Sequence, residues 1–485
     1  MNVALTRSPS RRLPAGLVAL AALLTAAAPA GAEVELRVDA SRRAGSLHRL
    51  HGVNNGPLNF GETIDLSDYY RQLAVPLVRL HDSEWPCGNV VDLHAIFPEL
   101  RADANRPGSY RFGRTDEYIR AIVKTGAKIV YRLGESIETT RKKYHVAPPA
   151  DYAQWTAACV GIIRHYNEGW AGGFRYGIRY WEIWNEPENR PSMWTGSDED
   201  YYRLYVTAAK AIKGRFPGLK VGGPSLGATG RLVGGRLEPT EFLKGFLAHC
   251  RKHAAPLDFF SWHTYCDDPQ LYVRKARAIR ALLDQRGFAK AEIHLNEWNY
   301  LPDNDWKPML SRRGLVRQRW FERIGGPGGA AFLACTLIGL QDAPVDAANY
   351  YSGETNCFGL FNRYGAPRKT FYAMKAFRAL LETPLRVAAW PAPSGERAVC
   401  AGVNGRGTEL TVLASNFRDK DKKWSLRVEK LPWPGETRWE ILRVDARCNL
   451  QRTGSGAARP GTLSLAGTWE APCVLLIRLG PKTVR

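Results

Sequence analysis

Two short segments of the chain end an apolar or aromatic run with a glutamate. The first runs from Trp181 to Glu188 with the sequence WEIWNEPE, and the second covers 293–299 with the sequence IHLNEWN. If both runs are parallel strands of a barrel, their C-terminal ends meet on one face, and Glu186 and Glu297 can lie on either side of a sugar. Two carboxyl groups about 5 Å apart, one ionised and one protonated, can cleave a glycosidic bond. The pair predicts a glycosidase mechanism that needs neither a metal nor an organic cofactor.

Two neighbouring glutamates have structural interpretations. Alternation along a strand places Glu182 on the same face as Glu186. A buried carboxylate needs a cation, so Glu182 is interpreted as the ion-pair partner of an arginine such as Arg132. Glu188 follows Pro187 and is interpreted as a loop carboxylate.

Six more polar or aromatic side chains fall at predicted strand ends, where a sugar would be bound: Asn54, His81, Asp82, His263, Trp298 and Tyr351. For the histidines, the alternative is a core position in which backbone groups satisfy the ring. For Trp298, a stacking platform for a sugar face and ordinary barrel packing are both open. The six positions extend the predicted site from two carboxylates to a carbohydrate-binding cleft.

The elements that would hold these side chains alternate between strand-like and helical segments from residue 49 to residue 383. The strand-like segments number eight, which is the number that closes a (β/α)8 TIM barrel: 50–54, 77–81, 128–132, 180–185, 219–222, 258–263, 292–296 and 347–351. Helical spacing predicts a helix that begins after Ser197, which is an N-cap candidate with Asp200 three residues on. A second helix is predicted over 115–125 and ends at Gly126.

The pattern changes after residue 383 to alternating, β-branched segments separated by glycine, proline and charged turns. This predicts a C-terminal β-sandwich over 384–485. The segment 33–48 has the same alternation and is expected to add the first strand of the mature chain to that sandwich. The catalytic barrel is therefore expected to occupy 49–383.

The first 32 residues have the three parts of an export signal. Basic residues at Arg7, Arg11 and Arg12 precede an apolar stretch, and Ala30 to Ala32 forms an A-x-A cleavage site. A retained membrane anchor is the alternative, but the stretch is short and ends in small residues. The mature protein is expected to be secreted or periplasmic, with no stable membrane span.

Charge and cysteine content narrow the range of partners. The net charge of +21 falls to +18 without the three signal arginines. Basic residues are spread along the chain without a nucleic-acid-binding motif, so the excess favours an acidic polysaccharide over nucleic acid, with general solubility as the alternative. Nine cysteines lack zinc spacing, and the loop with Cys87, Asp92 and His94 lacks it too, so no metal site is predicted.

The motifs at the strand ends resemble a known family. Asn185-Glu186-Pro187, Glu297 and His263-Thr264-Tyr265 look like the retaining glycoside hydrolases of clan A. The segments 51–57 (HGVNNGP), 79–82 (RLHD), 92–98 (DLHAIFP) and 261–265 (SWHTY) make the pattern similar to glycoside hydrolase family 39. That family contains β-xylosidases, α-L-iduronidases and bacterial exopolysaccharide hydrolases, and its members carry a β-sandwich beside the barrel.

The resemblance implies a role for each residue of the two motifs. Glu186 is the expected acid/base and Glu297 the expected nucleophile, with Asn185 bonded to the sugar 2-hydroxyl. Tyr265 and Arg79 are expected to contact Glu297 and hold it ionised. Glu186 is expected to keep its proton because Trp184 and Trp194 surround it.

Three functions agree with the sequence. The first is a secreted retaining glycosidase of family 39 type. The second is a clan A glycosidase of another family, such as an arabinofuranosidase or endoglucanase. The third is a non-catalytic carbohydrate-binding barrel, which the intact set of site residues disfavours.

Overall fold

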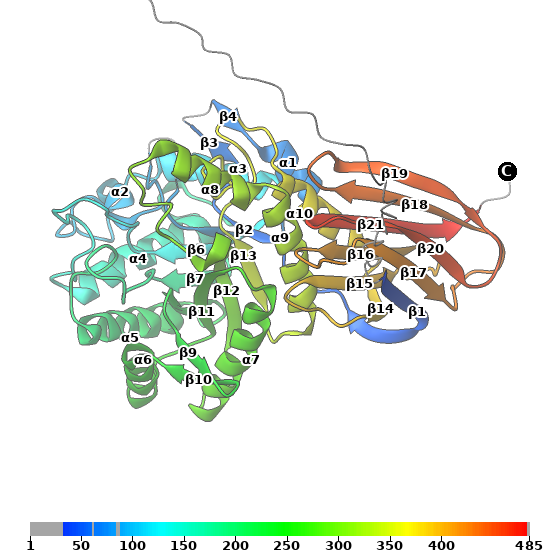
Figure 1. Ribbon diagram of the computed structural model, residues 1–485. Coiled ribbons are helices and arrows are strands. Elements are labelled where there is room, and N and C mark those ends of the chain that lie inside the picture. The colour runs from blue at the N-terminus through cyan, green and yellow to red at the C-terminus, as the bar shows by residue number, and fades with distance from the viewer. Residues whose placement is uncertain (1–32, 61–62, 84–87, 483–485) are drawn as a thin grey trace, which may run out of the picture.

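The computed structural model describes residues 33–60, 63–83 and 88–482. The predicted signal peptide, 1–32, lies outside the described residues. The described chain forms a closed eight-stranded barrel wrapped by helices and, beside it, a nine-stranded mixed sheet (Figure 1). Both the (β/α)8 barrel and the accompanying β-domain are confirmed.

The barrel strands follow one another around the barrel in chain order, and all neighbours are parallel. They are β2 (Gly52–Asn54), β5 (Leu77–Leu80), β6 (Lys128–Leu133), β7 (Tyr180–Ile183), β8 (Lys220–Leu226), β11 (Phe259–Cys266), β12 (Glu292–Tyr300) and β13 (Ala347–Tyr350). Each contains or overlaps one of the eight segments predicted from the sequence. Because the strands are parallel, all their C-terminal ends lie at one end of the barrel.

The helices cover the outside of the barrel, and two were predicted with their ends. They are α1 (Ser67–Leu73), α2 (Leu93–Ile96), α3 (Gly113–Lys124), α4 (Tyr152–Asn167), α5 (Asp198–Arg215), α6 (Glu241–Lys252), α7 (Pro269–Gln285), α8 (Gly314–Gly325), α9 (Pro327–Gly339) and α10 (Lys369–Leu380). Helix α5 begins with the expected capping box between Ser197 and Asp200. Helix α3 ends before Gly126, which has φ +86°.

Short elements complete the barrel domain. Two small antiparallel pairs lie outside the barrel sheet, and four single turns of 3₁₀ helix connect longer elements. The strands are β3 (Leu58–Asn59), β4 (Ile64–Asp65), β9 (Gly230–Val233) and β10 (Arg236–Pro239), and the turns are η1 (Pro107–Ser109), η2 (Trp170–Gly172), η3 (Pro302–Asn304) and η4 (Leu340–Asp342).

The second sheet contains the first described strand of the chain. Its order is β19-β18-β21-β16-β15-β14-β1-β17-β20. The strands are β1 (Glu33–Ser46), β14 (Leu385–Trp390), β15 (Arg397–Val403), β16 (Leu410–Asn416), β17 (Lys423–Glu429), β18 (Thr437–Val444), β19 (Asn449–Ala458), β20 (Leu463–Thr468) and β21 (Cys473–Pro481). The expectation that the N-terminal strand joins the C-terminal β-domain is confirmed, since β1 lies between β14 and β17.

Helices α9 and α10 join the two domains into one structure. Every residue of α9 from Gly329 to Gly339 is buried, and the helix contacts β15, β16 and β21 as well as α7 and α10. The core of the barrel therefore continues into Leu413 and Leu476 of the sheet. Among the described residues no single helix has the length and apolarity to cross a membrane, although the bent pair 314–325 and 327–342 passes that test by length and composition.

Candidate active site

A cavity of about 840 Å³ opens at the C-terminal end of the barrel. Its wall is built from the ends of the strands and the loops that follow them. The lining side chains include His81, Asp82, Asn185, Glu186, His263, Tyr265, Glu297, Trp306, Met309, Tyr351 and Phe358. Most of the residues predicted to bind sugar thus surround one space, with the two predicted catalytic glutamates between them.

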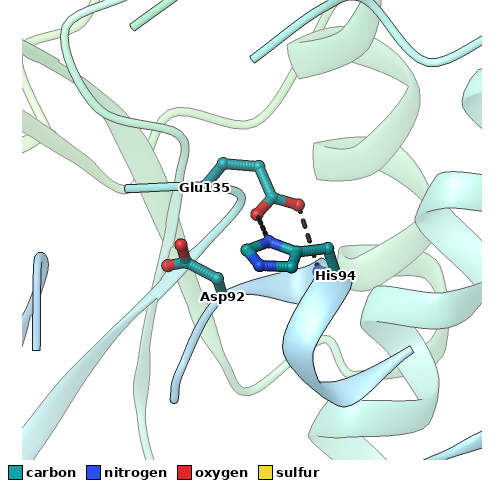
Figure 2. Close-up of side chains that lie close together, drawn as sticks. All are labelled: Asp92, His94 and Glu135. Atoms are coloured by element: carbon teal, nitrogen blue, oxygen red, sulfur yellow. Dashed lines mark hydrogen bonds and ion pairs between the residues drawn. The ribbon is translucent and has the colours of Figure 1, made fainter. Parts of the chain in front are cut away.

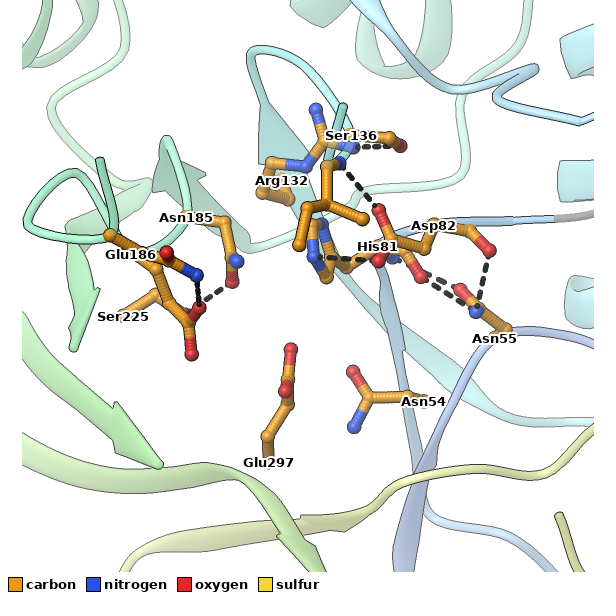
Figure 3. Close-up of polar contacts among 12 residues, drawn as sticks. Asn54, Asn55, His81, Asp82, Arg132, Ser136, Asn185, Glu186, Ser225 and Glu297 are labelled. Atoms are coloured by element: carbon orange, nitrogen blue, oxygen red, sulfur yellow. Dashed lines mark hydrogen bonds and ion pairs between the residues drawn. The ribbon is translucent and has the colours of Figure 1, made fainter. Parts of the chain in front are cut away.

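The two glutamates face each other across His263. Carboxylate oxygens of Glu186 and Glu297 lie within 4.8 Å of one another. The Nδ1 atom of His263 is 2.7 Å from Oε1 of Glu186 and 3.4 Å from Oε2 of Glu297. Figure 3 shows Asn185, Glu186 and Ser225 together on one side, with Glu297 between them and Asn54.

The backbone that carries these side chains is strained. Asp82, Trp184, Glu186 and Ser225 have φ values of 52°, 70°, 43° and 60°. A left-handed conformation costs a non-glycine residue about 1–2 kcal/mol, so a cluster of four at one barrel end marks a functional site. At Glu186 the conformation follows directly after the strand, and the backbone N–H of Glu186 donates to the carbonyl of Ser225 at 3.0 Å.

Glu297 is held by two donors, as expected. Nη1 of Arg79 donates to Oε1 at 2.8 Å, and the Tyr265 hydroxyl donates to Oε2 at 2.9 Å. Glu297 is only 6% exposed, so both contacts act in a low-dielectric environment. Burial and the neighbouring Glu297 charge raise the pKa of Tyr265 well above its ordinary value, so the phenol stays a donor.

Arg79 uses all five of its N–H donors inside the barrel. Nε donates to Glu182 at 2.6 Å, and Nη1 donates to Glu297 and to Oδ1 of Asn54. Nη2 donates to Oδ1 of Asn185 at 2.6 Å and to the hydroxyl of Ser225 at 2.7 Å. Burial lowers the pKa of Arg79, but the two carboxylates raise it by more, so the guanidinium stays charged.

The surroundings of Glu186 are polar, which corrects the prediction of an aromatic setting. The carboxylate of Glu186 is hydrogen-bonded to His263 and to the side-chain amide of Asn189, the latter at 3.0 Å. Trp184 instead packs against Trp194, and its indole N–H donates to the carbonyl of Met193. Burial raises the pKa of Glu186, but His263 and Asn189 outweigh it, so the pKa lies below its usual value. The positive φ of Trp184 explains the error, because the indole does not follow the alternation of the strand.

Comparison with known sequences decides the family. Residues 58–310, just over half of the chain, match the family described as "Glycosyl hydrolases family 39". This chain belongs to glycoside hydrolase family 39. The resemblance read from the motifs is confirmed, and the family 39 assignment replaces the alternative of another clan A family.

Relatives and solved structures agree with the family 39 assignment. A β-xylosidase of Geobacillus stearothermophilus is 29% identical over 328 residues, which are 60% of this chain and 61% of the relative. The chain thus spans about three fifths of the length of that curated relative. A glucosidase from Croceicoccus marinus superposes with a TM-score of 0.76 at 25% identity, over 93% of this chain and 100% of that one. A monomeric β-xylosidase from Caulobacter crescentus shares the fold, with a TM-score of 0.67 at 18% identity over 93% and 100%.

The family 39 barrel pairs its buried charges differently from the sequence prediction. Glu182 is buried, but its partner is Arg79 on β5, while Arg132 pairs with Asp92 at 2.6 Å. In a tilted barrel the side chains of one layer come from alternate strands. Arg79 on β5 and Glu182 on β7 share a layer, so Arg132 on the intervening strand β6 reaches the loop carboxylate instead.

Two predicted sugar-binding residues lie away from the cavity wall. Trp298 is fully buried and packs against Tyr272 and Tyr350, with ring centroids 5.8 and 5.3 Å apart. Asn54 is also fully buried, and its amide donates to the backbone carbonyls of Asn296 and Asn349. Strand alternation turns Trp298 outward, where it packs between the barrel and Tyr272 of helix α7, whereas Asn54 lies inside the barrel and accepts a hydrogen bond from Arg79.

Sequence reasoning also missed several residues of the family 39 site. Ser225 and Asn296 lie below the glutamates and connect Arg79, Glu182, Asn185 and His263. Ser225 was missed because the predicted strand ended at Gly222, whereas β8 continues to Leu226. Trp306 is 40% exposed, stands edge-on to Tyr265 at 5.3 Å and lines the cavity together with Tyr265, Tyr351 and Phe358.

Glu188 differs from its interpretation as a plain loop carboxylate. It is half-buried, and its Oε1 accepts the backbone N–H of Ala228 at 2.9 Å. Burial and the nearby charge of Glu186 raise the pKa of Glu188 to about 7. Glu188 is therefore a second titrating carboxyl close to the proposed acid.

Two clusters have the composition of a metal site. Glu186, His263 and Glu297 form one, and Asp92, His94 and Glu135 form the other. In the second, Arg132, the Ser136 hydroxyl and the Ser136 backbone N–H already bond Asp92. Figure 2 shows the Glu135 carboxylate facing the ring and backbone of His94. In each cluster an arginine already neutralises one carboxylate, so the residues favour ion pairs over metal binding. Neither cluster is assigned as a metal site.

Proposed function

We propose that this chain is a retaining glycoside hydrolase that cleaves O-glycosidic bonds of a poly- or oligosaccharide by double displacement. The supporting observation is the separation of the two carboxylates, whose oxygens lie within 4.8 Å. Retaining enzymes hold their carboxyl groups about 5–5.5 Å apart, whereas inverting enzymes need about 6.5–9.5 Å to admit a water. The separation in this barrel is of the retaining type.

In the first half of the reaction Glu297 acts as the nucleophile. A carboxylate oxygen of Glu297 bonds to the anomeric carbon while the bond to the leaving oxygen breaks and Glu186 gives that oxygen its proton. Arg79 and Tyr265 each donate a hydrogen bond to Glu297 and hold its carboxylate in place. The product is a covalent glycosyl-enzyme and a free alcohol.

In the second half Glu186 changes from acid to base. It takes a proton from a water that attacks the anomeric carbon, and the bond to Glu297 breaks. Asn185 holds the sugar throughout. Because Arg79 can only donate, Oδ1 of Asn185 faces it, which leaves the amide N–H groups of Asn185 for a sugar 2-hydroxyl. That contact strengthens as charge develops on the ring.

The substrate we propose first is a β-xyloside, with a β-glucoside second. The curated relative from Geobacillus is a β-xylosidase, and the neighbour from Croceicoccus is a glucosidase. Hydrolysis of nitrophenyl β-xyloside, β-glucoside, α-L-arabinofuranoside and α-L-iduronide by the mature chain ranks these sugars directly. If none is cleaved, the carbohydrate-binding barrel becomes the better proposal.

A trapping experiment tests the mechanism. A 2-deoxy-2-fluoro glycoside with an activated leaving group slows the second half of the reaction, so a covalent adduct accumulates. Peptide mass spectrometry should find the sugar on Glu297, and NMR of the first product of a true substrate should show the starting anomer. The inverted anomer, or an adduct on another residue, would contradict double displacement.

An acidic polysaccharide is a further candidate, supported by charge beside the cavity. Trp306, Met309 and Leu310 line the cavity, and the exposed segment that follows them carries Arg312, Arg313, Arg317 and Arg319. None of these four arginines has an ion pair to a described residue. Cations beside the mouth of the cleft would attract an anionic chain and release it at high salt.

Matched charge variants test this candidate. Arg312→Gln/Arg313→Gln/Arg317→Gln should weaken binding of glucuronoxylan at low salt and leave hydrolysis of a neutral nitrophenyl glycoside unchanged. Arg406→Gln/Arg452→Gln/Arg459→Gln removes the same charge from exposed positions in the second sheet and should leave both unchanged. If both triple variants weakened glucuronoxylan binding equally, the arginines beside the cavity would contribute only general electrostatic attraction.

We also propose export, with a secreted or periplasmic location, on the pattern of residues 1–32. The support is the basic, apolar and A-x-A succession of that segment. N-terminal sequencing of protein recovered from outside the cytoplasm should begin at Glu33. An intact N-terminus in the membrane fraction would favour a retained anchor.

A further inference from the structure

Ser225 occupies the centre of the polar network beneath the two glutamates. It is fully buried at the end of β8 with φ 60°, and its backbone N–H donates to the Ser261 hydroxyl at 3.0 Å. Four polar groups surround its hydroxyl oxygen: Nη2 of Arg79 at 2.7 Å, Nδ2 of Asn296 at 2.8 Å, Nε2 of His263 at 2.7 Å and Oδ1 of Asn185 at 3.0 Å.

The hydrogen atoms around this oxygen can be counted. A serine hydroxyl donates one hydrogen and accepts two. Arg79 can only donate, so it fills one lone pair. Asn296 must present its amide nitrogen as well, because the same Nδ2 donates to the carboxylate of Glu182 at 2.6 Å. Both lone pairs of Ser225 are therefore filled before His263 is considered.

The remaining contact decides the state of His263. A proton on Nε2 would place a third donor on an oxygen that can accept only two. The single hydroxyl hydrogen has two possible acceptors, Oδ1 of Asn185 at 3.0 Å and Nε2 of His263 at 2.7 Å. Oδ1 of Asn185 already accepts from Nη2 of Arg79, whereas an Nε2 without a proton has no other donor among the described residues. The hydroxyl therefore donates to Nε2, which leaves the ring proton on Nδ1, 2.7 Å from Glu186. We propose that Ser225 is a positioning residue that holds His263 as the neutral Nδ1–H tautomer, so that the imidazole donates to the Glu186 carboxyl group.

The charged groups around His263 act against this state. Glu186 faces the ring from the loop after β7 and Glu297 from β12. Glu188 lies close to Glu186, and Glu182 is bonded to Arg79 and Asn296. On the cationic side stands Arg79 on β5. His81 lies close enough to Glu186 to act on its carboxylate. Burial lowers the pKa of His263, but the carboxylates Glu297 and Glu186 raise it by more. The filled lone pairs of Ser225 are what oppose an imidazolium here.

The consequence for catalysis rests on the proposed function. A charged His263 would stabilise the Glu186 carboxylate and lower its pKa, so less of the enzyme would hold the proton that Glu186 must donate. A neutral ring donates the same hydrogen bond without the full charge, so Glu186 can both carry a proton and release it. Removing the Ser225 hydroxyl should let His263 become charged and should lower the pKa at which Glu186 loses its proton.

Nitrogen NMR tests the tautomer without any activity. In protein labelled with ¹⁵N-histidine, the His263 signal, assigned by its loss in His263→Gln, should show a protonated Nδ1 and an unprotonated Nε2 from pH 6 to pH 8. In Ser225→Ala it should show two protonated nitrogens. A charged ring or an Nε2–H tautomer in the unmodified protein, or an identical state in Ser225→Ala, would overturn the proposal. The measurement on the unmodified protein stands even if the variant does not fold.

The pH dependence of kcat/KM gives the second readout. Ser225→Ala should move the alkaline limb of the profile to lower pH, while Ser225→Thr, which keeps a hydroxyl, should restore it. Ser261→Ala is the control, since it removes a buried hydroxyl that bonds the Ser225 backbone but does not contact His263. A uniform loss of rate with an unmoved limb in Ser225→Ala would mean a purely structural serine.

Discussion

The barrel contains two groups of the same composition, each with two carboxylates and a histidine within 4.8 Å. Glu186, His263 and Glu297 line the large cavity, whereas Asp92 and His94 lie at the start of helix α2, after β5, and Glu135 lies in the loop after β6. In the first group each carboxylate oxygen accepts one hydrogen bond from the protein, and both glutamates line the cavity. In the second, Asp92 is 1% exposed and accepts three hydrogen bonds.

The difference shows that residue types do not by themselves make a reactive site. An arginine stabilises each group: Arg79 in the first and Arg132 in the second. Arg79 lies beneath the carboxylates and leaves their upper side to the cavity. Arg132 and Ser136 instead occupy the oxygens that a ligand would need. Reactivity therefore depends on where the donors stand, and the variants below test that distinction.

The largest effect should come from the nucleophile. Glu297→Gln cannot form the covalent intermediate, so kcat/KM on a nitrophenyl glycoside should fall by at least about 10⁴-fold. Glu135→Gln is the matched change in the other group and should leave kcat/KM close to that of the unmodified enzyme. Steady-state kinetics of both variants checks this, and a similar loss of kcat/KM in the two would contradict the distinction between the groups.

The acid should show a loss that depends on the leaving group. Glu186→Gln should cost about 10²–10⁴-fold with a poor leaving group, because no proton reaches the departing oxygen. With a dinitrophenyl glycoside, whose leaving group needs no proton, the first half of the reaction should be nearly normal. Kinetics over a series of aryl glycosides measures this slope, and a loss independent of the leaving group would assign Glu186 another role.

The two arginines should separate stability from catalysis. Arg79→Met and Arg132→Met each leave a buried carboxylate without its cation, which costs about 3–5 kcal/mol in the free energy of unfolding. Arg79→Met should also lower kcat/KM, because Glu297 loses a donor. Denaturant unfolding with parallel kinetics checks this, and an equal catalytic loss in Arg132→Met would remove the distinction between the groups.

The smallest effect should be a pH dependence of stability in the second group. Burial raises the pKa of Glu135 to about 7, and the Glu135 carboxylate raises the pKa of His94 despite burial. Both groups bind protons more tightly when folded, so they stabilise the fold at low pH. Glu135 loses its contribution as the pH rises to about 7, and His94 loses its contribution as the pH rises above its ordinary pKa. Urea unfolding from pH 5 to pH 8 should show a shallower fall in stability for Glu135→Gln, and an unchanged slope would contradict it.

Sequence periodicity predicted the secondary structure better than the side-chain partners. All eight barrel strands, the capping box at Ser197 and the union of β1 with the second sheet follow from local patterns. The meeting of Glu186 and Glu297 at one cavity followed from strand-end position, because parallel strands place their C-terminal ends together. The ion-pair partner of Glu182 could not be predicted in this way, because the tilt of the barrel decides which strands share a layer.

Trp184 and Trp298 show that a sequence position close to a glutamate does not place an aromatic side chain in the cavity. Both are aromatic residues beside a catalytic glutamate, and both are buried away from the sugar cavity. The positive φ at Trp184 and the register shift between β11 and β12 near His263 break the simple alternation of the strand ends. Such irregularities depend on long-range packing and have no strong local signal.

The amino-acid sequence by itself determined the barrel, the added β-domain, the family 39 pattern and the position of Glu186 and Glu297 at strand ends, because these depend on periodicity and on order along the chain. Only the tertiary structure decided that Arg79 is shared between Glu182 and Glu297, that Glu186 has polar neighbours and that Ser225 contacts His263. These contacts join residues from five different strands. Their geometry is set by barrel closure, which no local segment encodes.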